Sequence, residues 1–171
     1  VNLYDSYCVP GLCCFISPDF ERIIWKKIDR KRKLLPGKPI PPIEAYNENG
    51  VLIRTNELSC KFTIIWFWEP DCGSCIELTP VLNDFYHTYK PTLDFEVYAI
   101  ALTDDEQTWK EFIEEHHLDW VNVSFAYGDM NYDLINYFDI MTTPCLVLID
   151  SQHKILSRQL SFDKMKVIMS Q

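Results

Sequence analysis

The stretch TIIWFWEPDCGSCIELTP, residues 63–80, decides the fold of this chain. Its first part, residues 63–68, is apolar and β-rich at nearly every position, which predicts a strand buried on both faces. A helix is expected to follow from about Gly73 to Tyr89. Cys72 and Cys75 therefore lie where a buried strand gives way to a helix.

This position favours a reactive thiol at Cys72. The N-terminus of a helix presents unsatisfied backbone N–H groups and the positive end of the helix dipole, and both stabilise a thiolate over a thiol. Cys75 follows one turn later and is expected to be more buried and less acidic. The pattern predicts that Cys72 forms a mixed disulfide with a partner and that Cys75 resolves it.

A cysteine pair at this spacing can also bind zinc or form a structural disulfide. A zinc site generally requires four ligands, and the sequence offers neither a second Cys-x-x-Cys pair nor a histidine pair at ligand spacing. A structural disulfide remains open, but a bridge closing so short a loop constrains little of the unfolded chain. Redox use is the favoured interpretation, and no metal site is expected.

Strands and helices alternate along the rest of the chain. Further strands are expected at residues 95–102, 120–125, 145–150 and 155–160, and helices at 104–116, 131–138 and 161–169. Buried strands alternating with helices predict an α/β layered domain with a mixed sheet, in which the last two strands form an antiparallel hairpin.

The first 33 residues are expected to form a separate helical segment. Ser17 and Pro18 open an amphipathic helix that ends at the basic run WKKIDRKRK, and the proline-rich stretch LLPGKPIPPIE follows. We therefore divide the chain into residues 1–33, which could be the end of an upstream domain, and a main domain at 34–171. Three of the seven cysteines, Cys8, Cys13 and Cys14, fall in the first segment, and their role is open.

Charge and hydropathy exclude some classes of function. The chain carries a net charge of −9, and residues 1–33 hold seven basic and four acidic side chains, so the acidity resides in the main domain. An acidic domain repels phosphate backbones, which makes nucleic acid an unexpected partner. No apolar run approaches the roughly 20 residues that cross a bilayer, and no secretory signal is evident at the amino end.

Two motifs together resemble a known family. WFWEPDCGSC followed by a helix, and TTPCLVLID about 70 residues later, are similar to the thioredoxin fold, and LLPGKPIPPIEAYNENG resembles its TlpA-like branch of thiol–disulfide oxidoreductases. The resemblance implies a three-layer sandwich with a central mixed β-sheet flanked by helices. It also implies that Thr143-Pro144 is a cis peptide bond abutting the cysteine pair, and that Trp68, Thr143 and Pro144 bind substrate.

The same resemblance implies the partners and the setting. Cys72 and Cys75 would be the catalytic residues, and their disulfide would be the redox group, with no other cofactor. Cysteine-containing proteins and a thiol electron donor would be the partners. The family's setting is the bacterial periplasm or cell envelope, which allows for a membrane tether outside the given residues.

The chain departs from the family pattern near the cysteines. Trp66 stands where many thioredoxins have a buried acid, and Leu78 stands where TlpA-like proteins often have glutamate. The candidate modulators of the pair are Glu69, Asp71, Glu77 and Cys145. Cys145 is expected to be a buried small residue, with a sharper hypothesis that it forms an alternative bridge with Cys72 or Cys75.

Three classes of function follow from the sequence. The first is a thiol–disulfide oxidoreductase, acting as a reductant or an isomerase. The second is a thiol peroxidase on the same fold, although no cysteine completes the Pro-x-x-x-Thr-x-x-Cys pattern. The third is a non-enzymatic binding module with an inert cysteine pair.

Overall fold

The computed structural model describes residues 17–125, 132–158 and 161–171. Three cysteines lie outside the described residues, namely Cys8, Cys13 and Cys14. Residue 131, the start of the helix expected at 131–138, and residues 159–160, the end of the last expected strand, also lie outside them. Within the described part of the chain, no helix is both long and apolar enough to span a membrane.

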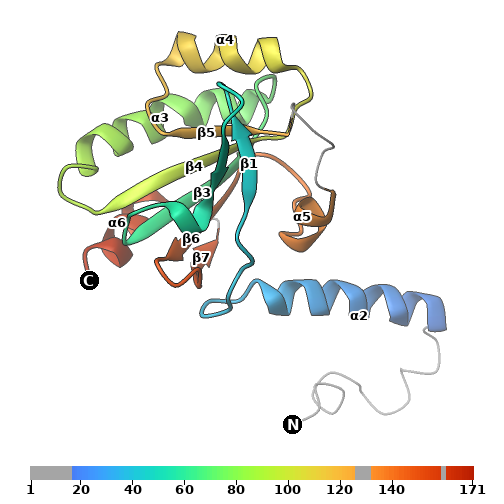
Figure 1. The fold of residues 1–171 in the computed structure, drawn as a ribbon. Helices are drawn as coiled ribbons and strands as arrows, with labels where there is room; N and C mark the ends of the chain where they lie inside the picture. The colour runs from blue at the N-terminus through green and yellow to red at the C-terminus, as the bar shows by residue number, and fades with distance from the viewer. Residues whose placement is uncertain (1–16, 126–131, 159–160) are drawn as a thin grey trace.

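A mixed seven-stranded sheet forms the centre of the described structure (Figure 1). Its strands lie in the order β2-β1-β5-β4-β3-β6-β7. The strands β3, β4 and β5 run parallel to one another, and the remaining neighbours pair antiparallel. The bounds are β1 Glu44–Asn47, β2 Leu52–Arg54, β3 Phe62–Trp68, β4 Phe95–Ala101, β5 Val121–Ser124, β6 Cys145–Asp150 and β7 Ile155–Arg158.

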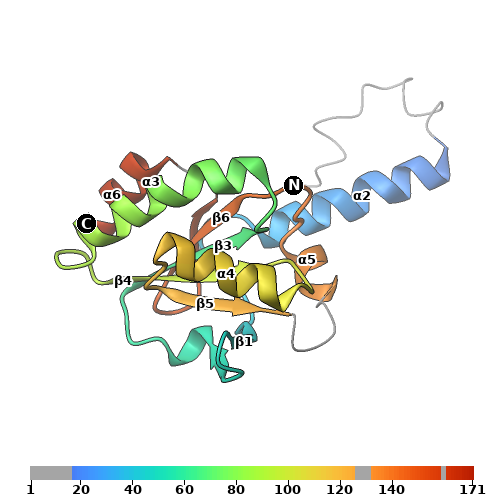
Figure 2. The ribbon, with the colours of Figure 1, turned by 90° about the horizontal axis from the view of Figure 1, so that it is seen from above.

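Helices flank this sheet on both faces, as Figures 1 and 2 show from two directions. The flanking helices are α3 Gly73–Tyr89, α4 Glu106–His116, α5 Tyr132–Tyr137 and α6 Phe162–Met169, with a short 3₁₀ helix at Thr55–Glu57, whereas α2 Pro18–Lys33 projects away from the sheet (Figures 1 and 2). The three-layer α/β arrangement expected from the sequence is confirmed.

The buried strand β3 separates two core clusters. Trp66 and Trp68 belong to one cluster, together with side chains from α3, α4 and α6. Ile65 and Phe67 belong to the other, together with Leu134 of α5 and residues that precede β1. Alternate residues of a strand point to opposite faces of the sheet, so these clusters fill its two sides. Every residue of β3 is buried, as its apolar run predicts.

The hairpin of β1 and β2 is an addition to the predicted elements. Its turn spans Asn47 to Gly50, where the Asn47 side chain accepts hydrogen bonds from the backbone N–H groups of Asn49 and Val51 at 3.0 and 2.8 Å. Gly50 adopts a φ of 72°, which glycine tolerates best. The flanking strands escaped prediction because they are short and only partly buried.

The proline-rich stretch between α2 and β1 is extended and packs on the domain. Leu34 is buried, and the backbone N–H of Gly37 donates to the carbonyl of Ile155 at 2.7 Å. The N–H of Ile40 donates to the carbonyl of His153 at 2.8 Å. This stretch is therefore attached to the β6–β7 hairpin, and the division of the chain at residue 34 stays a prediction.

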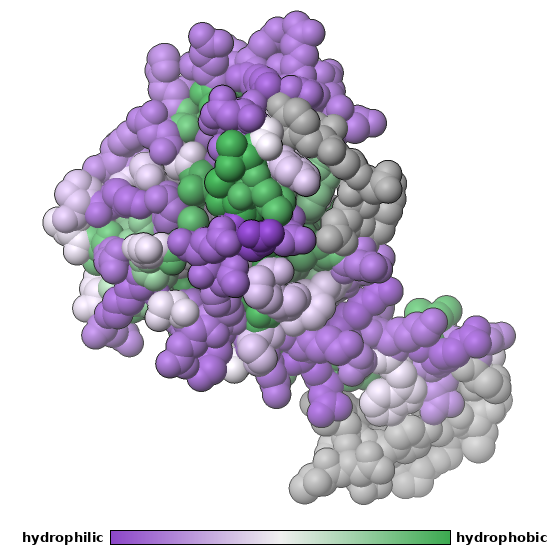
Figure 3. All heavy atoms as spheres, in the orientation of Figure 1, coloured by the Kyte–Doolittle hydropathy of each residue, from purple (hydrophilic) through white to green (hydrophobic). Residues whose placement is uncertain are grey.

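The helix α2 begins where the sequence indicates. The Ser17 side chain accepts a hydrogen bond from the N–H of Phe20 at 3.3 Å, and Pro18 follows at the first helical position. Phe20 and Ile23 are each 53% exposed. In the space-filling view, α2 otherwise presents a mainly hydrophilic surface (Figure 3).

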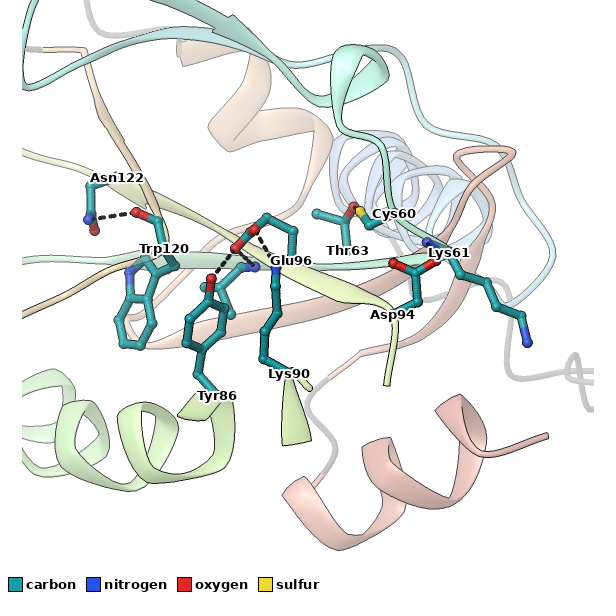
Figure 4. A network of polar contacts seen from close by, with 10 residues as sticks. Cys60, Lys61, Thr63, Tyr86, Lys90, Asp94, Glu96, Trp120 and Asn122 are labelled. Carbon is teal, nitrogen blue, oxygen red and sulfur yellow. Dashed lines mark hydrogen bonds and ion pairs between the residues drawn. The ribbon is translucent and has the colours of Figure 1, made fainter. Parts of the chain in front are cut away.

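A polar network lies at the start of β3 and β4, the sheet end opposite the Cys72–Cys75 junction (Figure 4). The half-buried Glu96 accepts a hydrogen bond from the Tyr86 hydroxyl at 3.0 Å and forms an ion pair with Lys90. Cys60 lies 3.5 Å from the hydroxyl of Thr63 in the same region. Cys60 therefore stands apart from Cys72 by the full length of β3.

Candidate active site

Cys72 lies at the N-cap of α3, directly after the turn that leaves β3. Its backbone N–H donates to the carbonyl of Glu69 at 3.2 Å, which closes the turn. Its carbonyl accepts the first helical hydrogen bonds, from the N–H groups of Cys75 at 2.9 Å and Ile76 at 3.0 Å. The junction predicted from residues 63–80 thus places a half-exposed sulfur at the start of the helix.

Several hydrogen-bond donors surround the Cys72 sulfur and lower the pKa of this thiol below its ordinary value. The largest cause is the side chain of Thr143, and the Cys75 thiol and the backbone N–H groups of Cys75 and Ser74 act in the same direction. Partial burial opposes them. In the protonated state the Cys72 thiol can instead donate to the Thr143 carbonyl oxygen, 3.6 Å away.

Cys75 is fully buried against the sheet and behaves in the opposite way. Burial raises the pKa of the Cys75 thiol to about 12, and the neighbouring Cys72 sulfur contributes to the increase. The two thiols therefore differ in the sense that the sequence predicts, with the more acidic sulfur half-exposed and the less acidic one buried. All four cysteines in the described residues are free thiols in the structure.

The register of the sheet brings the second motif to the first. The strands β3 and β6 pair antiparallel, with Phe67 opposite Cys145, so the residues that precede Cys145 continue alongside the turn after β3. The peptide bond between Thr143 and Pro144 is cis, as the resemblance implied. The Thr143 hydroxyl has one proton, which it can donate either to the Cys72 sulfur or to the Glu69 carboxylate, 3.4 Å away. Thr143 thus contacts both Cys72 and the turn that carries it.

The three candidate carboxylates have different surroundings. Glu69 is half-buried at the Thr143 hydroxyl, whereas Asp71 and Glu77 are exposed. A carboxylate close to Cys72 opposes thiolate formation by charge repulsion. The pKa of Cys72 is nevertheless lowered, so the surrounding donors outweigh these charges.

Trp68 requires a correction to the expected substrate contacts. Its side chain is fully buried, with its ring 5.0 Å from that of Trp66 in a stacked arrangement and 4.8 Å from that of Phe112. Trp68 therefore lies in the core and not on the surface around Cys72. Trp66, which replaces the buried acid of many thioredoxins, is also fully buried, and an indole offers only a donor.

Cys145 lies on the other side of the sheet from Cys75. It is buried in the cluster that contains Phe67, and its sulfur lies 3.7 Å from the Arg158 guanidinium. Burial raises the pKa of the Cys145 thiol. The structure does not bring Cys145 together with the reactive pair, which supports its role as a small core residue and argues against the alternative bridge.

A groove next to Cys72 combines Glu69 and Thr143 with residues that the sequence did not single out. It has a volume of about 280 Å³, and its walls come from the residue after β4, from α5 and from the loop before Pro144. Leu102 and Met141 are among them. Among the groove residues that the sequence did not single out, only Met141 has a local signal, because it precedes the Thr-Thr-Pro motif. The fold alone brings the remaining ones to the groove.

No arrangement of three or more His, Cys, Asp or Glu side chains suited to a metal ion occurs among residues 17–125, 132–158 and 161–171. The site is therefore described by its two sulfurs, the cis-proline loop and the adjoining groove.

These features define a thioredoxin-like α/β domain with a Cys-x-x-Cys pair at a strand-to-helix junction. A family profile described as thioredoxin-like matches residues 60–155, which is more than half of the chain. The chain therefore belongs to the thioredoxin-like family.

Curated relatives cover the chain at low identity. Human nucleoredoxin is 24% identical over 112 residues, spanning 65% of this chain and 25% of that protein. Zebrafish (Danio rerio) nucleoredoxin is 24% identical over 172 residues, spanning 92% of this chain and 40% of that protein. The chain thus spans between a quarter and two fifths of the length of these two relatives.

Solved bacterial structures share the fold. The C-terminal domain of a Bacteroides thetaiotaomicron protein assigned to the thiol-disulfide oxidoreductases has a TM-score of 0.71 and 27% identity, covering 81% of this chain and 95% of that chain. A thiol:disulfide interchange protein from Bacteroides sp. has a TM-score of 0.73 and 24% identity, covering 81% and 93%. These neighbours are consistent with the TlpA-like branch.

Proposed function

We propose that this chain is a thiol–disulfide oxidoreductase that exchanges a dithiol at Cys72 and Cys75 with cysteines of partner proteins. The observation that carries the proposal is the difference between the two sulfurs. The exposed Cys72 has a lowered pKa and the buried Cys75 a raised one. A nucleophilic thiol needs thiolate character and access, and a resolving thiol must wait until the first has reacted.

The exchange moves two electrons from the protein to its substrate. The Cys72 thiolate attacks one sulfur of a substrate disulfide, which forms a mixed disulfide and releases the first substrate thiolate. The Cys75 thiolate then attacks the Cys72 sulfur, which closes the Cys72–Cys75 disulfide and releases the second substrate thiolate. A thiol donor must return two electrons to the pair before the next cycle.

The resolving step becomes easier once the mixed disulfide has formed. The charge and hydrogen bonding of Cys72 help to keep the pKa of Cys75 high in the reduced protein. The mixed disulfide removes the charge of Cys72, so the pKa of Cys75 falls as resolution becomes necessary. The mixed disulfide at Cys72 therefore forms first, and Cys75 becomes a nucleophile afterwards.

The proposed role is that of a reductant or isomerase in the bacterial cell envelope. Support comes from the family resemblance and from bacterial neighbours, including a Cytophaga hutchinsonii domain at 25% identity and a TM-score of 0.71 whose description names a thiol-disulfide isomerase. Under this proposal the redox group is the cysteine pair itself, and Thr143 and Pro144 contact the substrate backbone.

Reduction of insulin disulfides with a dithiol donor tests the proposal. The wild-type chain is expected to accelerate the reduction, and Cys72→Ser is expected to reduce the rate to that of the donor alone. Consumption of hydrogen peroxide without insulin reduction would favour a thiol peroxidase. Absence of both activities, together with an ordinary pKa for Cys72, would favour a non-enzymatic binding module.

A further inference from the structure

The groove beside Cys72 combines apolar walls with one charged group. Leu102, Ile140 and Met141 contribute apolar surface, and Glu69 contributes a carboxylate. Thr143 lines the groove and also contacts the Cys72 sulfur. A substrate segment that reacts with Cys72 therefore passes the entrance of this groove.

Glu69 carries a negative charge that the protein does not neutralise. Its carboxylate accepts a hydrogen bond from the Thr143 hydroxyl at 3.4 Å. None of the ion pairs found among the described residues includes Glu69. A half-buried carboxylate without a cationic partner gains most from a partner that brings a positive charge.

A second hollow extends the negative charge on the other side of the turn. It measures about 200 Å³, and Pro70, Asp71 and Asp105 are among the residues that line it. Hydrogen bonds from Thr108 lower the pKa of Asp105, so this group stays ionised at neutral pH. Among the described residues, no Lys or Arg lines either hollow. The surroundings of Cys72 therefore attract cationic segments and repel anionic ones.

We propose that the groove selects substrates in which a Lys or Arg lies close to the reactive cysteine. The long apolar stem of such a side chain fits along Leu102 and Met141, and its cationic end reaches Glu69. Lys and Arg characteristically bury their stems while their charged ends stay in a polar environment. A purely apolar side chain would leave Glu69 without a partner, and an acidic one would meet repulsion.

This inference rests on the proposed thiol–disulfide exchange and names its substrate class. It is tested with disulfide-bonded peptides that differ only by Lys or Gln, placed in turn at each position flanking the cysteine. At the best position, wild-type protein should reduce the Lys peptide with a kcat/KM about two- to five-fold above that of the Gln peptide, the range of one partly exposed ion pair. Added salt should lower this ratio.

Two variants and one control assign the selectivity to the groove. Glu69→Gln should bring the ratio of the Lys-peptide rate to the Gln-peptide rate close to one, whatever its effect on the absolute rate for either peptide. Met141→Lys changes a side chain that is 77% exposed and should also lower the ratio, because it places a cation of the protein itself in the groove. Glu115→Gln removes the same charge at an exposed position on α4 and should leave the ratio unchanged.

The outcomes separate this inference from the proposed function. Equal rates for the Lys and Gln peptides at every position would overturn the inference and leave the oxidoreductase intact. Reduction of neither peptide would overturn the proposed function as well. A ratio that survives both groove variants, or that Glu115→Gln abolishes as effectively, would contradict the assignment to Glu69.

Discussion

The Cys72 sulfur lies 3.6 Å from the carbonyl oxygen of Thr143, although 71 residues separate them in the sequence. The pairing of β3 with β6 creates this contact, because it aligns the turn that carries Cys72 with the loop that carries Thr143. The reactive sulfur is thereby held between a helix N-terminus and a second segment that supplies hydrogen bonds.

The pH dependence of alkylation should distinguish Cys72 from Cys75. The lowered pKa of Cys72 means that its reaction with iodoacetamide reaches half its maximal rate at a lower pH than that of an ordinary cysteine, near 8.5. Cys75, with a pKa of about 12, should stay unmodified at neutral pH. Mass spectrometry of the labelled peptides gives both results, and preferential labelling of Cys75 would reverse the assigned roles.

Replacement of Thr143 should raise the pKa of Cys72. Thr143→Val removes the side-chain hydrogen bond that is the largest cause of the lowered value. A hydrogen bond to a charged group stabilises the charged form, so its loss should move the pKa of Cys72 upward. Thr142→Val, a neighbouring exposed position, serves as the matched control. An unchanged alkylation profile for Thr143→Val would exclude this role of the hydroxyl.

Trp68 should affect stability more than substrate binding. Trp68→Ala should lower the free energy of unfolding by about 3–5 kcal/mol, because it leaves a cavity among stacked rings in the core. Trp68→Phe should cost less and keep the KM for insulin. Chemical denaturation and steady-state kinetics give the two quantities. An increased KM in Trp68→Phe with unchanged stability would indicate that Trp68 contacts the substrate.

Cys145 should take no part in the redox cycle. Cys145→Ala should keep the rate of insulin reduction, with a loss of about 1 kcal/mol in stability for the shortened core side chain. After mild oxidation of the wild-type protein, mass spectrometry should find Cys72 linked to Cys75. A peptide that links Cys145 to either of them would contradict the placement of these sulfurs on opposite sides of the sheet.

The sequence predicts elements more reliably than it predicts neighbours. The apolar run of β3, the capped start of α2 and the strand-to-helix position of Cys72 are local patterns, and the structure confirms them. The short strands of β1 and β2 carry too little periodicity to be found alone. β2 pairs with β1, and β1 also pairs with β5, a contact between segments far apart in the chain.

The face of the sheet to which a side chain points was harder to predict than the motifs. Trp68 lies next to the cysteine turn in sequence, yet the alternation of β3 directs it into the core beside Trp66. Cys145 follows the proline that abuts the site, yet its own alternation directs it to the opposite face. The groove that contains Met141 depends on the placement of α5, which no motif specifies.

Trapping of a mixed disulfide tests the central claim most directly. In Cys75→Ser the resolving thiol is absent, so a substrate with an activated disulfide should remain covalently attached. Mass spectrometry should locate it on Cys72, and Cys72→Ser should give no adduct under the same conditions. Attachment at Cys60 or Cys145 in place of Cys72 in Cys75→Ser, or an adduct at Cys75 in Cys72→Ser, would contradict the account.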